Sequence, residues 1–210
     1  PDPLFRPRRL ACGGGRVLLA GGFGVLEANL SAGVAVPAVC EQGLEVLDLA
    51  LRCPVPCRSL VLTRASNGSP EIVDCGSGRR QRLRPGAELF AVDPAGERMV
   101  VSHGGELVQY RARGQDWEPE FDLGVDGGQL VGLDYAGDKL LLFREAKLGL
   151  FQRAVEVRAA GSLELVAKLG VPNGLLPLQA GCGLDSGRQA LVIAAPTGFG
   201  SLARLVQLSL

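Results

Sequence analysis

Residues 94–111 read PAGERMVVSHGGELVQYR and carry the pattern from which the rest of the chain is built. A turn is followed by the basic residue Arg98, an apolar and β-branched run, the pair Gly104-Gly105, and a second run in which apolar and polar residues alternate. Two such runs joined by a two-glycine turn are typical of a β-hairpin. The segment therefore predicts two antiparallel strands.

The turn, the basic residue and the apolar run recur along the chain. The basic residues that open the runs are separated by 42, 40, 41 and 49 positions, and they are Arg16, Arg58, Arg98, Lys139 and Arg188. A period of roughly 40–45 residues, in which each unit holds several short strands, is typical of the blades of a β-propeller. We therefore predict an all-β chain that forms a five-bladed β-propeller with four-stranded antiparallel blades.

The apolar runs group into five blades within a single domain of residues 1–210. The predicted blades span residues 9–40, 45–86, 88–124, 130–171 and 175–210. The last blade has only three runs, so we expect residues 3–8 to supply its fourth strand and close the ring, which would hide two exposed strand edges. A partial propeller from a longer, processed chain and a β-sandwich are the alternatives.

Three prolines fit this grouping. Pro37, Pro85 and Pro119 all fall in the fourth run of a predicted blade. Proline cannot donate a hydrogen bond to a strand ladder and is tolerated on edge strands. Their repeated position predicts that the fourth strand is the outer edge of its blade.

Through its hairpin copies and its period, the chain resembles β-propellers of the WD-repeat type over almost its whole length. The Trp-Asp signature of that family is missing, because the only tryptophan, Trp117, follows Asp116. The single histidine, His103, falls in a predicted hairpin turn. The resemblance implies an architecture, and it transfers no functional residue.

The overall charge favours no polyanionic partner. The 22 Lys and Arg balance the 22 Asp and Glu, so no global field would hold nucleic acid or an anionic membrane. Charged residues, Gly or Pro interrupt every apolar run well before 18 residues, which predicts a soluble chain without a membrane span, although a membrane complex could be its partner. Because the sequence starts at Pro1 without methionine, we favour an organelle lumen or another compartment reached after removal of a targeting segment over the cytosol.

The six cysteines are the most distinctive polar set. In the blade arrangement most of them lie in connections on one face of the disc, and the candidates for disulfides are Cys12, Cys53, Cys57, Cys75 and Cys182. Cys12 and Cys182 would meet if the first and last blades are neighbours, while Cys53 and Cys57 could bridge each other or pair with Cys75. Free thiols are the other interpretation. With one histidine and no C-x2-C pair, we predict neither a metal site nor another cofactor.

We predict no catalytic residue. His103 lacks any acid or nucleophile that the sequence can place beside it. Asp93 and Asp134 stand at corresponding ends of the first strands of the third and fourth predicted blades, where they could face a central channel together as glycosidase carboxylates do. Such repeated positions more often mark a turn or a hydrogen-bonded strand end, and we favour that interpretation.

Two neighbouring outer runs carry opposite charges. Arg80, Arg82 and Arg84 share one parity and would project from one face of a strand. The next blade carries an acidic row of the same kind, formed by Asp116, Glu118, Glu120 and Asp122, with Trp117 on the opposite face. Charged edges block aggregation between sheets. Complementary rows can also orient a protein partner, with the apolar side as an anchor.

Together these features predict a non-catalytic interaction module or scaffold, an accessory subunit of a larger complex whose partners are other protein subunits. The alternative is a small five-bladed propeller hydrolase, similar to glycosidases, or a lectin. Aromatic residues, on which sugar rings stack, make up only 5% of the chain.

Overall fold

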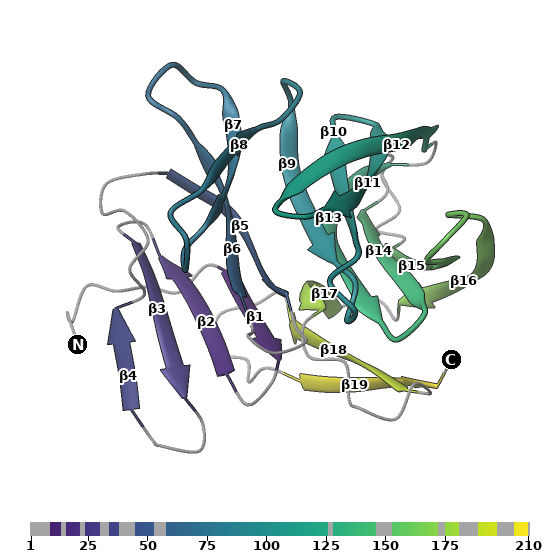
Figure 1. Ribbon diagram of the computed structural model, residues 1–210. Coiled ribbons are helices and arrows are strands. Elements are labelled where there is room, and N and C mark those ends of the chain that lie inside the picture. Colours follow the sequence, from purple (N-terminus) through teal and green to yellow (C-terminus); the bar gives the residue numbers. More distant parts are fainter. Residues whose placement is uncertain are drawn as a thin grey trace. The chain divides into compact units, whose positions relative to one another are not determined.

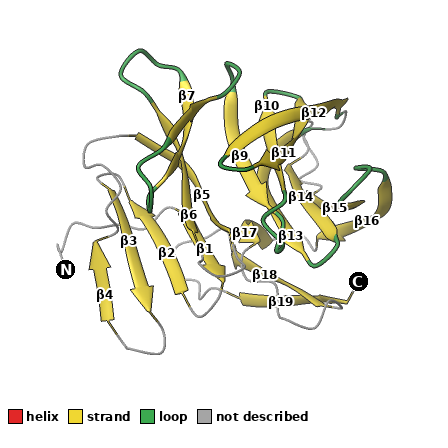
Figure 2. Ribbon diagram, in the orientation of Figure 1, coloured by secondary structure: helices red, strands yellow, loops and turns green. Residues whose placement is uncertain are grey.

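A computed structural model describes residues 9–13, 16–21, 24–29, 34–37, 45–52, 58–125, 128–145, 153–171, 175–180, 189–196 and 204–209. These residues form strands and the turns between them (Figure 2). The chain divides into two compact units, Pro1–Asp122 and Leu123–Leu210. Their strands are labelled in Figure 1. Among the described residues there is no helix long and apolar enough to cross a membrane.

In the described part of the first unit the strands form three four-stranded antiparallel sheets, each with its strands in chain order. The first sheet contains β1 (Arg9–Gly13), β2 (Arg16–Gly21), β3 (Gly24–Asn29) and β4 (Val34–Pro37). The second contains β5 (Glu45–Arg52), β6 (Arg58–Arg64), β7 (Pro70–Asp74) and β8 (Arg80–Arg82). The third contains β9 (Ala87–Val92), β10 (Arg98–His103), β11 (Glu106–Arg113) and β12 (Asp116–Gly124).

The second unit repeats this plan. One four-stranded antiparallel sheet contains β13 (Gln129–Ala136), β14 (Lys139–Glu145), β15 (Arg153–Ala159) and β16 (Leu165–Val171). Among the described residues the last sheet has three strands, β17 (Leu175–Ala180), β18 (Gln189–Pro196) and β19 (Arg204–Ser209). Residues 3–8, predicted to add a fourth strand, lie outside the described residues, and a single domain spanning both units stays a prediction.

Within each unit, consecutive sheets meet through their first strands. Within the first unit β1 contacts β5 and β5 contacts β9, and within the second unit β13 contacts β17. Successive antiparallel sheets that pack against one another in this way are consistent with propeller blades. The predicted all-β class and its four-stranded antiparallel units are therefore confirmed.

The second strand of the second sheet shows why its sequence is a continuous apolar run. Leu60 and Leu62 of β6 belong to a core cluster shared with Phe90, Met99 and Trp117 of the third sheet. Val61 between them belongs to a second cluster that includes residues of the first sheet. Because successive side chains of a strand point to opposite faces, a sheet packed on both faces needs apolar residues at every position.

Asp48 links the first strands of the second and third sheets. Its side chain is buried in β5. Oδ2 accepts a hydrogen bond from the Phe90 N–H of β9 at 2.9 Å, and Oδ1 accepts one from the Leu49 N–H at 3.0 Å. A buried carboxylate needs such partners, since an unpaired one is costly to desolvate.

The prolines follow the prediction at two of three positions. Pro37 ends β4 and Pro119 lies within β12, each the outer strand of its sheet. Pro85 was wrongly assigned to a strand, because β8 ends at Arg82 and Pro85-Gly86 form the turn before β9, where Gly86 has a φ of 83°. His103 likewise ends β10, and the turn that follows is made by Gly104-Gly105.

Candidate functional site

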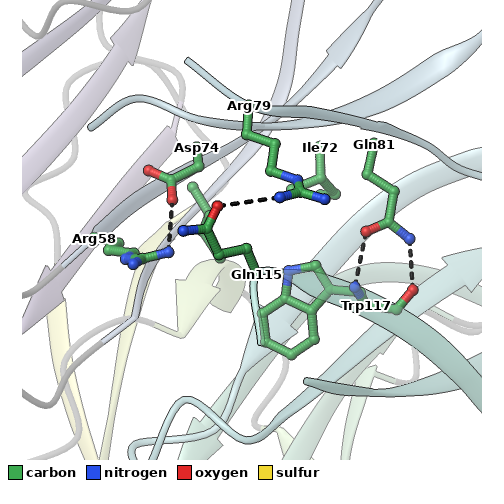
Figure 3. A pocket seen from close by; sticks show the side chains of 8 residues that line it. Arg58, Ile72, Asp74, Arg79, Gln81, Gln115 and Trp117 are labelled. Atoms are coloured by element: carbon green, nitrogen blue, oxygen red, sulfur yellow. Dashed lines mark hydrogen bonds and ion pairs between the residues drawn. The ribbon is translucent and has the colours of Figure 1, made fainter. Parts of the chain in front are cut away.

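A small pocket lies between the second and third sheets of the first unit (Figure 3). Strands β6 and β7 form one side of it, and β8 with the β11–β12 hairpin forms the other. The residues that line it are Arg58, Leu60, Ile72, Asp74, Arg79, Gln81, Gln115 and Trp117. The pocket therefore combines apolar side chains with polar side chains, which come from β6, β7 and β8 and from the turns that precede β8 and β12.

Asp74 organises the turn between β7 and β8. Its Oδ1 accepts hydrogen bonds from the N–H groups of Gly76, at 2.9 Å, and Ser77, at 3.3 Å. Its Oδ2 lies 3.2 Å from Nη1 of Arg58, the first residue of β6. An aspartate that binds main-chain N–H groups two and three residues onward stabilises a turn, which is the local reason for its position here.

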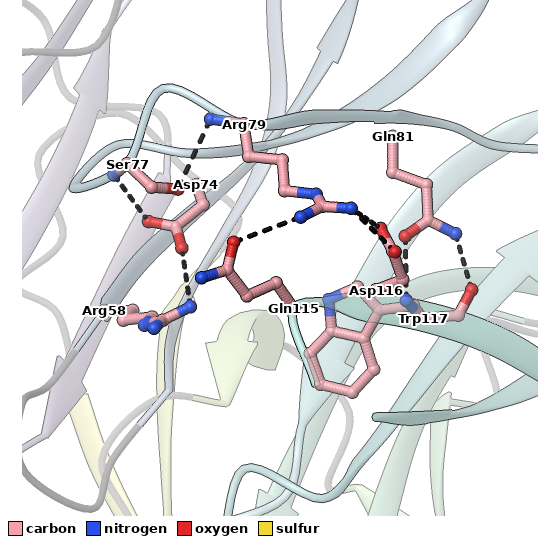
Figure 4. Close-up of polar contacts among 8 residues, drawn as sticks. All are labelled: Arg58, Asp74, Ser77, Arg79, Gln81, Gln115, Asp116 and Trp117. Carbon is pink, nitrogen blue, oxygen red and sulfur yellow. Dashed lines mark hydrogen bonds and ion pairs between the residues drawn. The ribbon is translucent and has the colours of Figure 1, made fainter. Parts of the chain in front are cut away.

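Arg79 joins this turn to the neighbouring hairpin (Figure 4). Its Nη1 donates to Oε1 of Gln115 at 3.1 Å, and its Nη2 lies 2.6 Å from both carboxylate oxygens of Asp116. Ser77 orients the start of this segment, because its Oγ accepts the N–H of Arg79 at 3.3 Å. The guanidinium thus connects the second sheet with the third.

The side chain of Gln81 makes a second connection between these sheets, by binding the main chain of Trp117. Its Nε2 donates to the carbonyl oxygen of Trp117 at 2.5 Å, and its Oε1 accepts the N–H of Trp117 at 2.8 Å (Figures 3 and 4). A side-chain amide offers one acceptor and donors in the same plane, so it can pair with a peptide group as a neighbouring strand would. This amide joins the outer strands of two sheets that have no described ladder between them.

The polar groups that line the pocket differ in how many of their donor and acceptor atoms have described hydrogen-bond partners. The oxygens of Asp74 and Asp116 accept the hydrogen bonds given above. Arg58 is about one-third exposed, and its one described partner is Asp74, bound through Nη1. Gln115 uses Oε1 for Arg79, and in Figure 4 its amide nitrogen points toward Arg58 and Asp74. Donor groups of Arg58 and Gln115 therefore have no partner among the described residues.

The basic row predicted on β8 is divided between two partners. Arg80 Nη1 and Arg82 Nε each lie 3.4 Å from an oxygen of Glu71, a buried residue of β7 in the same sheet. Arg84 lies beyond the end of β8, and its Nη1 is 2.5 Å from Oδ2 of Asp122 in β12. The strand is too short for one parity to hold from residue 80 to residue 84.

The acidic row predicted on β12 is also paired within the chain. Glu118 lies 3.6 Å from Nε of Arg113, and Glu120 lies 3.1 Å from Nε of Arg111, both across the β11–β12 hairpin. Asp116 and Asp122 instead reach the second sheet through Arg79 and Arg84. Trp117 is buried on the opposite face, as predicted from its parity.

Sequence reasoning missed four polar residues that line the pocket, Arg58, Arg79, Gln81 and Gln115. The one sequence signal among them is at Arg58, which is a repeated basic position.

Of the candidate disulfide cysteines, the structure describes the side chain of Cys75 alone. Cys75 is disulfide-bonded and packs against the core cluster that contains Leu18, Leu49 and Val61. Cys12 lies in β1, but its side chain is outside the described residues, as are Cys53, Cys57 and Cys182. The pairing of these cysteines stays a prediction. In the described part of the chain, no three His, Cys, Asp or Glu side chains are placed to hold a metal ion.

Asp93 and Asp134 do not occupy corresponding positions. Asp93 follows β9, and its Oδ1 accepts the N–H groups of Glu97, at 2.7 Å, and Arg98, at 3.0 Å, so it stabilises a turn. Asp134 lies inside β13 opposite Leu141, and its Oδ1 accepts the N–H of Tyr135 at 2.8 Å. The predicted correspondence was wrong, because the two first strands differ in register.

His103 is half-buried at the end of β10. Its Nδ1 lies 3.4 Å from the carbonyl oxygen of Pro85, and its Nε2 has no described hydrogen-bond partner. Burial lowers the pKa of this imidazole below its usual value, and nearby Arg84 lowers it further. The ring is accordingly held in its neutral form, next to the Arg84–Asp122 ion pair.

Comparisons with known proteins identify the class of fold. No family model and no curated protein matches the sequence. The structure is similar to hydrazine synthase from Kuenenia stuttgartiensis, with 13% identity and a TM-score of 0.60 over 100% of this chain and 67% of that one. It is also similar to the calcium-binding protein regucalcin from Agrobacterium tumefaciens, with 14% identity and a TM-score of 0.60 over 94% of this chain and 70% of that one.

Two further structures extend this comparison. BBS1N, solved in complex with ARL6DN, has 16% identity and a TM-score of 0.60 over 97% of this chain and 64% of its own. PorZ, a surface component of the type IX secretion system of Porphyromonas gingivalis, has 18% identity and a TM-score of 0.57 over 97% of this chain and 26% of its own. Hydrazine synthase, regucalcin and BBS1N are β-propeller proteins, so the chain is structurally similar to β-propellers. At these identities the likeness concerns the fold alone.

Proposed function

We propose that this chain is a non-catalytic interaction module and an accessory subunit of a larger protein complex. The surface that we assign to docking is formed by the charged residues around β8 and the β11–β12 hairpin, and is called the rim below. Its members are Arg79, Arg84, Arg111, Arg113, Asp116, Glu118, Glu120 and Asp122.

The observation that carries this proposal is the density of exposed ion pairs on the rim. Four arginine–carboxylate pairs lie on these strands and turns, and all their side chains are at least one-third exposed. Exposed pairs contribute about 0–1 kcal/mol each to stability, which gives a weak structural reason for keeping four together. Charges of both signs fixed on strands are well suited to orient a protein partner and to reject others.

Two other functions have less support. Charged side chains on an outer strand also prevent pairing between sheet edges, and the experiment below separates that role from docking. A propeller hydrolase or lectin would draw on Asp93 and Asp134, whose carboxylates already accept main-chain hydrogen bonds. No contact among the described residues favours that second function.

A charge swap tests the rim without removing its internal pairs. In the double variant Arg84→Glu/Asp122→Arg the ion pair is kept in reverse, so the free energy of unfolding should stay within about 1 kcal/mol of the original. The charges presented to a partner are inverted, so the amount of partner that co-purifies from the native source should fall at least about tenfold at low salt. Quantitative mass spectrometry of the purified complexes measures this change.

The matched control is the swap Glu45→Arg/Arg64→Glu. These residues form an exposed pair of 3.0 Å on β5 and β6, outside the rim. This variant should retain its partners. Recovery of the original chain as a lone monomer, or equal loss of partners in both swaps, would contradict docking through the rim.

For the finer architecture, we propose that the five sheets are five blades and that residues 3–8 complete the last one. Pairing of both chain ends would remove two strand edges, which supports closure on physical grounds. Deleting residues 1–8 should then lower the melting temperature by at least about 4 °C, which corresponds to roughly 1–2 kcal/mol for a chain of this size. An unchanged melting temperature in calorimetry would sink the closed arrangement.

A further inference from the structure

Among the described four-stranded sheets, the outer strand of the fourth sheet is the least protected against pairing with another chain. This strand, β16 (Leu165–Val171), is the last of its sheet (Figure 1). The other outer strands are short, charged or interrupted: β4 has four residues and ends at Pro37, β8 has three residues of which two are arginine, and β12 contains Pro119 and four acidic residues. β16 has seven residues, no proline and one charged residue, Lys168. An edge of this kind is a template for a further strand.

Two apolar side chains at the start of β16 are exposed. Leu165 is 53% and Val166 is 55% exposed, and in the described part of the chain they are the exposed large apolar side chains. In the ladder with β15, adjacent residues of β15 pair with Leu165 and Ala167, so Val166 has no partner in the ladder. This bulge disturbs the edge locally. From Ala167 to the end of β16 the register is regular and leaves a continuous edge.

The two faces of this edge differ in charge. Ala167 and Leu169 pack against the core cluster of the fourth sheet. Lys168 lies on the other face, opposite Glu156 in the ladder; it is 57% exposed, and its Nζ is 3.9 Å from Oε1 of Glu156. The same oxygen lies 2.9 Å from Nε of Arg144, so among the described residues Lys168 shares its carboxylate with a buried cation. A strand added here would meet apolar side chains on one face and a positive charge on the other.

We propose that the free edge of β16 binds an extended segment of another protein as a fifth strand, with a carboxylate opposite Lys168 and an apolar residue on either side of that carboxylate. The apolar residues would extend the face on which Ala167 and Leu169 pack against the core. In this mode of recognition, main-chain hydrogen bonds give affinity and alternate side chains give specificity. Opposite charges directly across two strands are favourable. The inference goes beyond the proposed function, because the rim belongs to the first unit and β16 to the second.

A second copy of the chain fits this edge less well. Two identical antiparallel strands related by a two-fold axis pair around one central residue. If that residue were Lys168, the two ammonium groups would lie opposite each other, and if it were Leu169 they would be diagonal neighbours. Like charges at these positions are unfavourable. A partner segment with an acidic residue avoids this repulsion.

Three peptides serve as probes of the edge. They are acetyl-Thr-Val-Glu-Val-Thr-amide, the same peptide with lysine in place of glutamate, and the glutamate peptide with methyl groups on its main-chain nitrogens. Each is titrated into the ¹⁵N-labelled full chain at low salt and followed by NMR, which locates the site and measures the affinity. We expect saturable shifts of the β16 amide signals with the first two, and a dissociation constant about three- to tenfold lower for the glutamate peptide, because Lys168 is partly exposed and its gain is screened. The methylated peptide should not bind, because it cannot donate hydrogen bonds to the edge.

Substitutions assign the preference to Lys168. Lys168→Gln should abolish the preference for the glutamate peptide, while the glutamate and lysine peptides still bind through their main chains. The fold should be kept, because Lys168 is the most exposed of the described cations around Glu156. The matched control is Lys139→Gln. Lys139 lies in β14 of the same sheet and pairs with Asp138 at 2.9 Å, so its loss should leave the preference unchanged.

Three results of the titrations would overturn the inference: no saturable shift up to about 5 mM peptide, shifts away from β16, or equal dissociation constants for the glutamate and lysine peptides. Sedimentation equilibrium tests the second copy. A dimer of the original chain that tightens in Lys168→Gln would assign the edge to self-association and would also refute the proposal. The rim swap at Arg84 and Asp122 changes no residue of β16, so either proposal can fail while the other stands.

Discussion

Replacing Glu156 with alanine is expected to lower the free energy of unfolding of the second unit by about 3–5 kcal/mol. Glu156 and Arg144 are both about 95% buried, and their Oε1 and Nε atoms lie 2.9 Å apart. The second carboxylate oxygen is 3.0 Å from Nη2 of Arg158. Without Glu156 the Arg144 guanidinium would stay buried without its described ion-pair partner, which is the costly state. Urea denaturation followed by circular dichroism measures the loss.

A variant that removes both charges is the control for this prediction. Arg144→Met/Glu156→Leu fills a similar volume with apolar groups and removes the buried Arg144 charge together with its partner, so it should be more stable than Glu156→Ala. Of the other cations that face this carboxylate, Lys168 is 57% exposed and can turn toward water. Arg158 is 13% exposed and keeps its hydrogen bond to the carbonyl oxygen of Leu163 at 2.8 Å. If Glu156→Ala lowers the free energy of unfolding by less than about 1 kcal/mol, this ion pair is not buried in solution.

Trp117→Ala is expected to cost about 3–5 kcal/mol in the first unit. The indole is 5% exposed and packs in the cluster shared by the second and third sheets, with Leu60, Ile72 and Tyr110 among its members. Removing it leaves a cavity between the sheets as well as losing apolar burial. Denaturation followed by circular dichroism at 220 nm measures the change, since the variant has no tryptophan fluorescence.

Trp117→Phe tests how much of this cost comes from the apolar contact of the ring. Gln81 binds only the N–H and carbonyl groups of residue 117, so both variants keep these hydrogen bonds, and phenylalanine also keeps most of the apolar contact. We expect it to lose less than half as much stability as the alanine variant. Equal losses in the two variants would mean that the ring does not fill the space between the sheets.

Strand order was predictable from the sequence because it depends on neighbours in the chain. The stretch quoted first forms β10 and β11, with Arg98 opposite Arg111 and Met99 opposite Tyr110. Gly104 has a φ of 68°, a conformation that glycine adopts readily, which explains the turn at that position. Alternating patterns and turn residues therefore fix each hairpin locally.

The pocket and the charge pairs were less predictable because they depend on contacts between sheets. Gln81 and Trp117 are 36 positions apart, and a glutamine between two arginines gives no sign of a main-chain partner. Parity grouped Arg84 with Arg80 and Arg82, but β8 ends at Arg82 and the chain turns before Arg84. A parity rule holds only while the strand continues.

The links made by Gln81 and Asp48 also bear on how such a chain can evolve. Each binds a main-chain group of the next sheet, the peptide groups of Trp117 and Phe90 respectively. A main-chain N–H is present in every residue type except proline, so these hydrogen bonds do not depend on the side chain at position 90 or 117. Neighbouring repeats can then accumulate substitutions while the attachment between them is inherited unchanged. Duplicated hairpins held in this way can diverge far in sequence before they lose their common architecture.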